Sequence, residues 1–109
     1  MGIKAQAVTP HWFVPESQKD DPKPARFRVR PLTALEWYAL ADSFGSTAES
    51  ARTVIDHGLL GWENIEHPET GEALKFDSDA IWTLPREILD EIGEHIVESS
   101  RTSEDQAKN

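Results

Sequence analysis

Four histidines are the residues of this chain with the widest chemical repertoire, because imidazole can bind a metal ion or transfer a proton near neutral pH. They lie in four different segments of the sequence: His11, His57, His67 and His95. Glu91 and His95 are four residues apart, a spacing that places two ligands on one helix face, but this pair stands alone. The chain has no cysteine, the commonest ligand of structural zinc. We therefore expect no metal site and interpret His95 as a helix-boundary residue beside Ile92 and Ile96.

The carboxylates and serines give no sign of catalysis. Residues 41–109 contain sixteen acidic residues, so carboxylate pairs of the kind that hydrolases use arise by chance. No serine lies in a Gly-x-Ser-x-Gly motif, and neither glycine-rich motif for nucleotide phosphates is present. A chain of 109 residues also has little room for a substrate cleft. We expect a protein that is not an enzyme and that uses no cofactor.

Charge is distributed unevenly along the chain. Residues 1–40 have six Lys and Arg against four Asp and Glu, a net charge of +2, whereas residues 41–109 have five against sixteen, a net charge of −11. A negative potential of this size repels nucleic-acid phosphates, so we expect no nucleic-acid partner. The simplest interpretation of the acidity is that it keeps the protein soluble.

Three arginines form the one basic cluster of the sequence. Arg26, Arg28 and Arg30 alternate with Phe27 and Val29, which is the pattern of a half-buried strand with a charged outer face. One interpretation is that the charges protect an exposed sheet edge. The other is that they form a docking strip for an acidic partner or for the acidic helix of this protein itself. We expect no aromatic residue on the arginine face, which disfavours single-stranded nucleic acid as the partner.

Four tryptophans are further candidates for binding. Trp37 lies in a helical apolar stripe and is interpreted as core. Trp12, Trp62 and Trp82 lie near the ends of predicted elements, where an indole either packs under a loop or contacts a partner. Both interpretations stay open for these three residues.

The elements that must position these residues are those of an α+β fold, a mainly helical single domain of three to four helices with an N-terminal β-hairpin. A chain of 109 residues allows one domain with a modest core. The predicted globular part spans residues 11–98, between a flexible N-terminus at 1–10 and a flexible acidic tail at 99–109. Its predicted elements are a hairpin over 11–30 and helices over about 33–44, 47–60, 78–83 and 84–98.

Local signals set the predicted helix boundaries. Thr33 and Glu36 have the spacing of a capping box, in which each side chain accepts a hydrogen bond from the backbone N–H of the other. Gly45 and Gly61 follow periodic apolar stretches and are expected to end the first and second helices. Asp77 is expected to cap the short third helix.

The last predicted helix is amphipathic and acidic. Its apolar stripe consists of Ile88, Leu89, Ile92 and Ile96, and the periodicity stops at Ser99. The stripe is either core or a helix face offered to an apolar partner segment. The candidate partner-binding residues of the sequence are therefore Trp62, Trp82, Ile88, Ile92, Ile96, Arg26, Arg28 and Arg30.

The sequence shows no membrane or export signal. No apolar run approaches the ~20 residues that span a bilayer. Residues 1–6 lack the apolar stretch of a signal peptide. We expect a cytoplasmic protein with no membrane partner.

The second half of the chain contains a series of short motifs. They are Gly61-Trp62-Glu63-Asn64-Ile65, an acidic turn with Gly71, Phe76, the step Leu84-Pro85 before Ile88-Leu89-Asp90-Glu91-Ile92, and the ending Ser103-Glu104-Asp105-Gln106-Ala107-Lys108-Asn109. Together they resemble the tail assembly chaperones of long-tailed bacteriophages and prophages. The run Arg28-Val29-Arg30-Pro31-Leu32-Thr33 is similar to the segment before the first helix of that family. The resemblance covers about half to two thirds of the chain, and the N-terminal hairpin lies outside it.

The resemblance implies a non-enzymatic assembly factor. Members of that family bind the long helical tape measure protein, keep its apolar segments soluble and help recruit tail tube subunits. They act in the cytoplasm of the bacterial host and are absent from the mature virion; we expect a monomer or a weak homo-oligomer. Many are also made in a longer form by ribosomal frameshifting, and Ala107-Lys108-Asn109 can be encoded with a slippery heptamer.

Two other hypotheses stay open. One is a small acidic inhibitor or decoy that binds a basic partner through salt-sensitive contacts. The other is a small enzyme or metal protein in which His57, His67 or His95 meet in one cleft. A chaperone would instead hold an apolar helical client at moderate salt, because apolar contacts carry such a complex.

Overall fold

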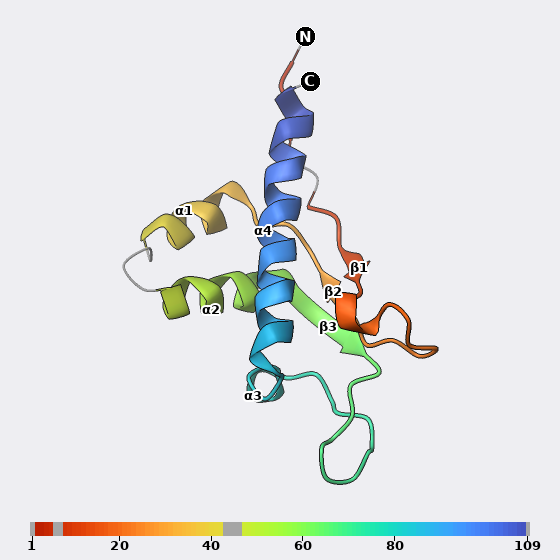
Figure 1. Ribbon diagram of the computed structural model, residues 1–109. Helices are drawn as coiled ribbons and strands as arrows, with labels where there is room; N and C mark the ends of the chain where they lie inside the picture. Colours follow the sequence, from red (N-terminus) through yellow and green to blue (C-terminus); the bar gives the residue numbers. More distant parts are fainter. Residues whose placement is uncertain (1, 6–7, 43–46, 109) are drawn as a thin grey trace.

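The computed structural model describes the backbone of residues 2–5, 8–42 and 47–108 and the side chains of residues 2–5, 8–40 and 50–100. The described chain combines a small antiparallel sheet with α-helices (Figure 1), which confirms the predicted α+β fold. In chain order the elements are β1 (His11–Phe13), a 3-10 helix (Glu16–Gln18), β2 (Arg26–Val29), α1 (Ala34–Asp42), α2 (Thr47–Gly58), β3 (Leu59–Glu63), α3 (Ser78–Ile81) and α4 (Arg86–Lys108).

The sheet has the strand order β1-β2-β3, with β2 in the middle. The pairing of β1 with β2 confirms the predicted hairpin within residues 11–30. Because side chains alternate between the two faces of a strand, Phe27 and Val29 lie on one face, and Arg26 and Arg28 lie on the other. Phe27 and Val29 are buried, so we call their face the inner face and the arginine face the outer face.

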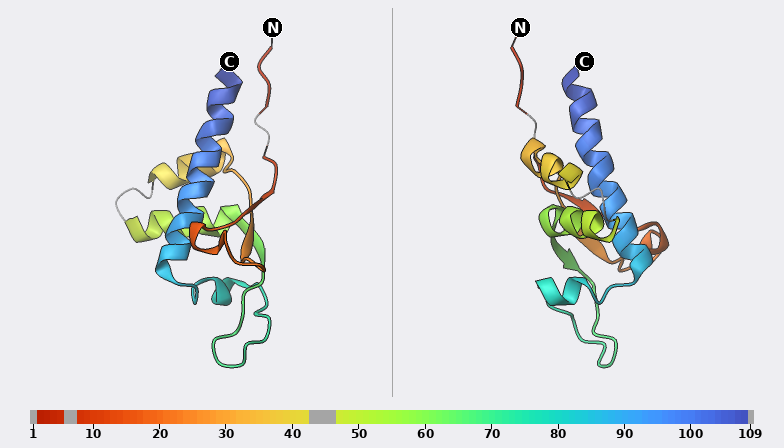
Figure 2. Two further views of the ribbon diagram at one scale, coloured as in Figure 1. Left: turned by 45° about the vertical axis from the view of Figure 1, so that its right-hand side comes forward. Right: turned by 90° about the vertical axis from the view of Figure 1, so that its left-hand side faces the viewer.

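The core lies between the inner face of the sheet and the helices. α2 and α4 pack against each other, and α4 crosses in front of the sheet (Figures 1 and 2). The buried core residues are Phe27, Val29, Leu32, Leu40, Val54, Ile55, Leu59, Ile81, Ile92 and Ile96. The apolar stripe of α4 is thus a core element over its middle turns.

The second helix ends earlier than the sequence predicts. It ends at Gly58, not at Gly61, and the next five residues form β3. Gly58 lies so close to α4 that a Cβ atom there would be 2.6 Å from Cδ1 of Ile96. Its carbonyl also accepts a hydrogen bond from Arg30 N at 2.9 Å, which joins the end of α2 to the end of β2. Strand pairing, which no local signal reveals, therefore overrides the helical periodicity.

Two predicted helix caps are confirmed. Thr33 N donates to Glu36 Oε1 at 2.8 Å, and Glu36 N donates to Thr33 Oγ1 at 3.2 Å, which is the reciprocal pattern of a capping box. Asp77 accepts hydrogen bonds from two backbone N–H groups of α3 at 2.9 and 2.7 Å. The predicted end of the first helix at Gly45 lies outside the described residues.

The last helix is longer than predicted. The sequence predicts its end at residue 98, but the backbone of α4 is helical through Lys108. The loss of apolar periodicity at Ser99 does not mark the end of the helix, because no Gly or Pro interrupts residues 94–108. Ser100 is buried on α4: its Oγ accepts from Leu32 N at 2.8 Å and donates to the carbonyl one turn earlier.

Candidate functional site

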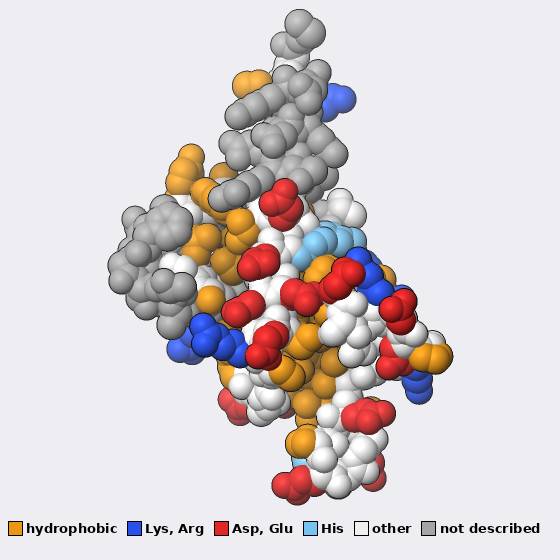
Figure 3. Space-filling model, viewed as in Figure 1, with side chains coloured by type: hydrophobic (Ala, Val, Ile, Leu, Met, Phe, Trp, Pro, Cys, Tyr) orange, Lys and Arg blue, Asp and Glu red, His pale blue; other side chains and the backbone are white. Residues whose placement is uncertain are grey.

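A groove of about 770 Å³ lies between the loop that follows β1, the loop that follows β3 and the first turns of α4. Its floor is apolar and includes Phe27, Ile65, Leu74, Leu84 and Ile88. Phe27 is buried, and the other four are half-buried. Figure 3 shows a hydrophobic strip between the start of α4 and the neighbouring loops. We call this surface the apolar groove.

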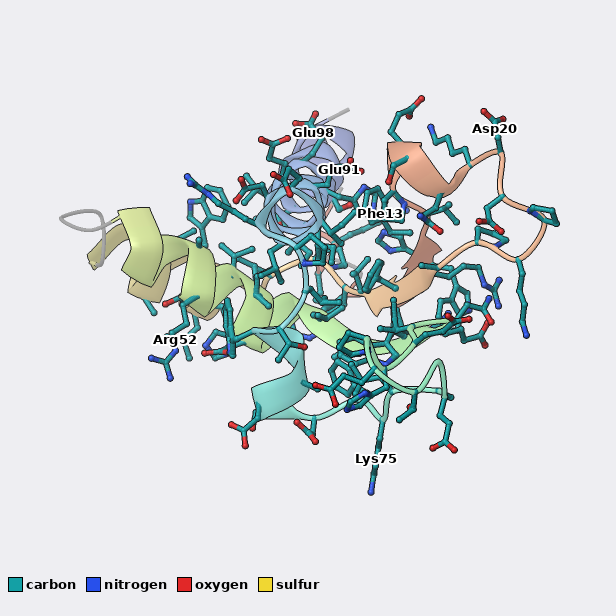
Figure 4. All side chains as sticks on the ribbon, turned by 60° about the horizontal axis from the view of Figure 1, so that its bottom comes forward. Phe13, Asp20, Arg52, Lys75, Glu91 and Glu98 are labelled. Atoms are coloured by element: carbon teal, nitrogen blue, oxygen red, sulfur yellow. The ribbon has the colours of Figure 1, made fainter. Side chains whose placement is uncertain are left out.

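Charged side chains surround the apolar groove. Asp21, Lys23 and Glu66 line it, and the Asp21 carboxylate accepts a hydrogen bond from Lys23 N at 2.9 Å. The two flanking loops carry further exposed carboxylates, among them Asp20, Glu69 and Glu72. Figure 4 shows Asp20 at the tip of its loop, projecting away from the helices. The rim is acidic, so the groove is complementary to an apolar segment with basic flanks.

Trp62 holds the loop that forms one wall of the groove. Its Nε1 donates to the Leu74 carbonyl at 2.8 Å, and its ring meets Phe27 and Phe76 edge-on with centroids 6.4 and 5.0 Å apart. Asn64 begins the loop with a φ of 62°, a left-handed conformation that asparagine tolerates. Its Nδ2 donates at 2.8 Å to a carbonyl of the loop before β2. These contacts make Trp62 a packing residue that shapes the groove.

The isoleucine stripe of α4 is divided between the groove and the core. Ile88 lines the groove, whereas Ile92 and Ile96 are both 0% exposed. A partner cannot reach these two buried side chains in this structure, which favours the core interpretation for them. Trp82 is 41% exposed just after α3 and lies outside the groove lining.

The outer face of the sheet carries a second cluster, Trp12 with Arg26 and Arg28. Trp12 stands opposite Arg28 in the register of β1 and β2. The Cζ atoms of Arg26 and Arg28 lie 4.5 and 5.5 Å from the centroid of the Trp12 ring, within the range of cation–π attraction. We call these three residues the Trp–Arg face.

Two expectations about the arginines are wrong. β2 is the central strand, so Arg26 and Arg28 do not protect a sheet edge, and Arg30 lies just after the strand. An aromatic residue, Trp12, does lie on the arginine face. The cause is the same in both cases: strand order and register depend on pairing between segments that are far apart in the sequence.

Arg30 differs from the other two arginines because it is used inside the fold. Its guanidinium donates to both carboxylate oxygens of Glu36, at 2.8 and 2.6 Å. His57 Nδ1 lies 3.2 Å from the same carboxylate. The hydrogen bond from Arg30 is the main cause that lowers the pKa of Glu36 to about 2. This cluster ties the approach to α1 to the end of α2.

Two of the four histidines meet at the contact between β1 and α4. His11 Nε2 and His95 Nε2 are 2.7 Å apart, and Phe13 stacks on the His95 ring with centroids 4.3 Å apart. Figure 4 shows Phe13 on the side of β1 that faces α4. One ring must donate and the other accept, so the pair cannot hold both rings doubly protonated. Burial, followed by the neighbouring His11, lowers the pKa of His95.

The other two histidines have separate local contacts. His57 contacts Glu36, and His67 Nδ1 accepts from Glu69 N at 3.3 Å. Within the described part of the chain, no group of three or more His, Asp or Glu side chains is arranged to hold a metal ion. The meeting of His11 with His95 was not visible in the sequence, because 84 positions separate them and no motif joins them.

Exposed apolar side chains on α1 were missed by the sequence reasoning. Leu35 is 78% exposed and Tyr38 is 68% exposed. They are three residues apart and therefore share one face of the helix. A signal was present, since neither residue belongs to the stripe of Trp37 and Leu40 that packs inward.

Comparisons with protein-family models, curated proteins and solved structures find no match. In the described ranges, no helix has both the length and the apolar character needed to cross a membrane. The function must therefore be argued from the two surfaces, the apolar groove and the Trp–Arg face, and from the motifs of the sequence.

Proposed function

We propose that this protein is a tail assembly chaperone of a long-tailed phage or prophage, which holds an apolar helical segment of the tape measure protein in the apolar groove. In this proposal it is not an enzyme, acts in the cytoplasm of the bacterial host, helps recruit tail tube subunits and is absent from the mature virion. The observation that carries the proposal is the groove itself, an apolar floor inside an acidic rim.

Some residues of the motifs that resemble the chaperone family line this groove. Asn64 and Ile65 of the first motif line it, as do Leu84 and Pro85. Ile88, from the last helix motif, lines it as well. The other side of the groove, from Pro15 to Phe27, belongs to the hairpin region outside the resemblance.

The size and chemistry of the groove suit such a client. Its volume of about 770 Å³ and its apolar floor give room for a few apolar side chains from one face of a helix. Each apolar client side chain that becomes fully buried contributes about 1.5–3 kcal/mol, so three or more anchors on one helix face are needed to exceed the cost of association, which is about 4 kcal/mol or more. The acidic rim and the net charge of −9 keep the complex soluble.

Co-expression with the tape measure protein of the same phage tests the proposal. The wild-type chain is expected to keep the client in the soluble fraction and to co-purify with it at about 0.5 M salt, where surface charge is screened. Ile65→Glu and Leu84→Glu place a charge in the groove and are expected to release the client. Leu60→Glu changes an exposed leucine outside the groove and serves as the matched control.

The possible results separate the function from its site. Failure of the wild-type chain to hold the client contradicts the function. Normal binding by both groove variants, with the fold verified by circular dichroism, contradicts the assignment of the groove. The coding sequence at codons 107–109 supplies an independent check, since a slippery heptamer followed by an open −1 frame is expected for a member that is also made in a longer form.

One observation favours a second candidate, an acidic inhibitor or decoy for a basic partner. Exposed carboxylates follow one another along α4 at Glu87, Asp90, Glu94 and Glu98, and Figure 3 shows acidic side chains along this helix. A decoy binds through charge, so its complex is expected to dissociate at about 0.5 M salt. Survival of the complex at that salt therefore distinguishes the chaperone from the decoy.

A further inference from the structure

The Trp–Arg face is open to solvent on an otherwise acidic protein. Trp12 is 39% exposed, and the side chains of Arg26 and its partner Glu63 are 37% and 45% exposed. Gly61 stands opposite Arg28 on β3. Among the described residues, the nearest atom to a Cβ placed on Gly61 is Arg28 Cβ at 3.9 Å, so the centre of the face is uncovered.

The two arginines of this face differ in their pairing. Arg26 donates to Glu63 through both Nε and Nη2. In the part of the chain whose side chains are described, no carboxylate forms an ion pair with Arg28. The indole of Trp12 lies against both guanidinium groups and limits their freedom through cation–π attraction. Arg28 therefore offers a partly fixed fork of N–H donors, which matches a carboxylate.

We propose that the Trp–Arg face is a second docking site, which binds a short acidic segment of a partner protein. One carboxylate of the segment pairs with Arg28, a second shares Arg26 with Glu63, and an apolar side chain on the same face of the segment packs on Trp12. Residues 26 and 28 are about 6.6 Å apart along the strand. Carboxylates two residues apart in an extended segment, or one turn apart in a helix, have a similar spacing.

Charge selects this occupant over two others. A long polyanion such as nucleic acid would extend beyond the face and meet the surrounding carboxylates of a protein with a net charge of −9. A second copy of the chain would bring the same net charge and would be repelled as a whole. A short acidic segment contacts only the local positive charge of Arg26 and Arg28, so it avoids most of this repulsion.

The experiment uses the 109-residue chain and a fluorescently labelled peptide in which two glutamates and a leucine occupy successive alternating positions, so that all three side chains lie on one face of an extended segment. Anisotropy at low salt is expected to show binding that Arg28→Gln weakens about tenfold, the loss of one charge-assisted contact. Trp12→Ala is expected to weaken it several-fold, and Arg28→Lys to give an intermediate loss because the fork geometry is gone. Lys75→Gln is the matched control, since Figure 4 shows Lys75 projecting away from the fold.

Each remaining outcome counts for or against the proposal. Absence of binding, or equal binding by the wild type and Arg28→Gln, overturns it, as does equal binding of a peptide with glutamine in place of glutamate. Tighter binding of a labelled oligothymidine that is lost in Trp12→Ala assigns the face to nucleic acid instead. A salt-sensitive dimer that is lost in Arg28→Gln assigns it to a second copy. Retained peptide binding by Ile65→Glu supports a site independent of the proposed chaperone groove.

Discussion

The apolar groove and the Trp–Arg face lie on opposite faces of one small sheet, and adjacent residues of β2 contribute to each. Phe27 is in the floor of the groove, while Arg26 and Arg28 stand on the outer face. The groove is closed by loops from distant parts of the chain, whereas the outer face is produced by the register of two neighbouring strands. Strand alternation can therefore give a 109-residue protein two surfaces of different chemistry on the two faces of one sheet.

The largest expected effect is a loss of stability from a core substitution, because the core supports both the apolar groove and the Trp–Arg face. Ile96 lies on α4 and is 0% exposed, because its side chain is part of the core. Ile96→Ala is expected to cost about 2–5 kcal/mol in the free energy of unfolding, through lost burial and the cavity left behind. Urea unfolding followed by circular dichroism measures this loss. A cost below about 1 kcal/mol would contradict the packing described for α4.

The contact between α2 and α4 can be tested by a pair of substitutions. Gly58→Ala is expected to cost about 1–3 kcal/mol, because the new Cβ would lie 2.6 Å from Ile96 Cδ1. In the Ile96→Ala background this cost is expected to shrink, since the clashing atoms are absent. Gly71→Ala is the control: Gly71 has a φ of 74° and no side-chain neighbour within 4 Å, so its cost is additive with Ile96→Ala. Equal costs of Gly58→Ala in both backgrounds would refute the close approach.

Variants of Arg30 and Arg28 are expected to separate an effect on stability from an effect on peptide binding. Glu36→Gln and Arg30→Gln are each expected to lower stability by about 1–2 kcal/mol at pH 7 and to leave peptide binding intact. Arg28→Gln is expected to change stability by less than about 0.5 kcal/mol. Urea midpoints and peptide anisotropy for the three variants give both quantities. Loss of peptide binding in Arg30→Gln, with the fold intact, would contradict the assignment of Arg30 to the fold and of Arg28 to peptide binding.

The ion pair of Arg30 with Glu36 is expected to make the free energy of unfolding fall at acid pH. The pKa of Glu36 is lowered from 4.5 to about 2 in the folded protein. Its stabilisation is therefore complete above about pH 4.5 and is lost as the pH falls towards about 2. The stability difference between the wild type and Glu36→Gln is expected to narrow across this window in urea midpoints taken at each pH. A difference that stays constant down to pH 2 would be inconsistent with the lowered pKa.

The smallest expected effect is a pH dependence of stability at the contact between β1 and α4. His95 has a lowered pKa, so the folded state favours the neutral ring and stability falls as the pH drops below about 6.5, where the unfolded ring takes up a proton. We expect this loss at the contact of β1 with α4, where His95 meets His11 and Phe13. Amide hydrogen exchange should show that the protection of β1 decreases more between pH 7 and pH 5 than the protection of the groove loops does. His95→Phe should abolish this pH dependence.

The parts of the fold that sequence could predict are those with local signals. The alternation of residues 26–30 and the capping box of Thr33 and Glu36 are confirmed because strand period and cap spacing involve neighbouring residues. The first residues of β3, Leu59 and Leu60, were assigned to the second helix, and the buried Ser100 was missed. Each depends on a partner far along the chain: β2 for the strand and Leu32 for the serine. Apolar periodicity describes what is buried and carries no information on such pairings.

The candidate site follows the same rule. Ile88 could be predicted as a binding residue because it belongs to an apolar helix stripe. The loop residues Ile65 and Leu74, which complete the groove, have no periodic signal, and Trp62 and a left-handed Asn64 bring them into place. The cluster of arginines in residues 26–30 could be recognised in the sequence. Its contact with Trp12 could not, since the strand register across a long hairpin loop cannot be predicted from composition.

We propose that the apolar groove, and not another surface, binds an apolar helical client. The most direct measurement is a titration of the ¹⁵N-labelled chain with a synthetic amphipathic helix whose leucine stripe is flanked by lysines, followed by amide chemical shifts. The account predicts saturable shifts at Ile65, Leu74, Leu84 and Ile88 that persist at moderate salt. Shifts confined to Leu35 and Tyr38 on α1, or lost once the salt is raised, would contradict it.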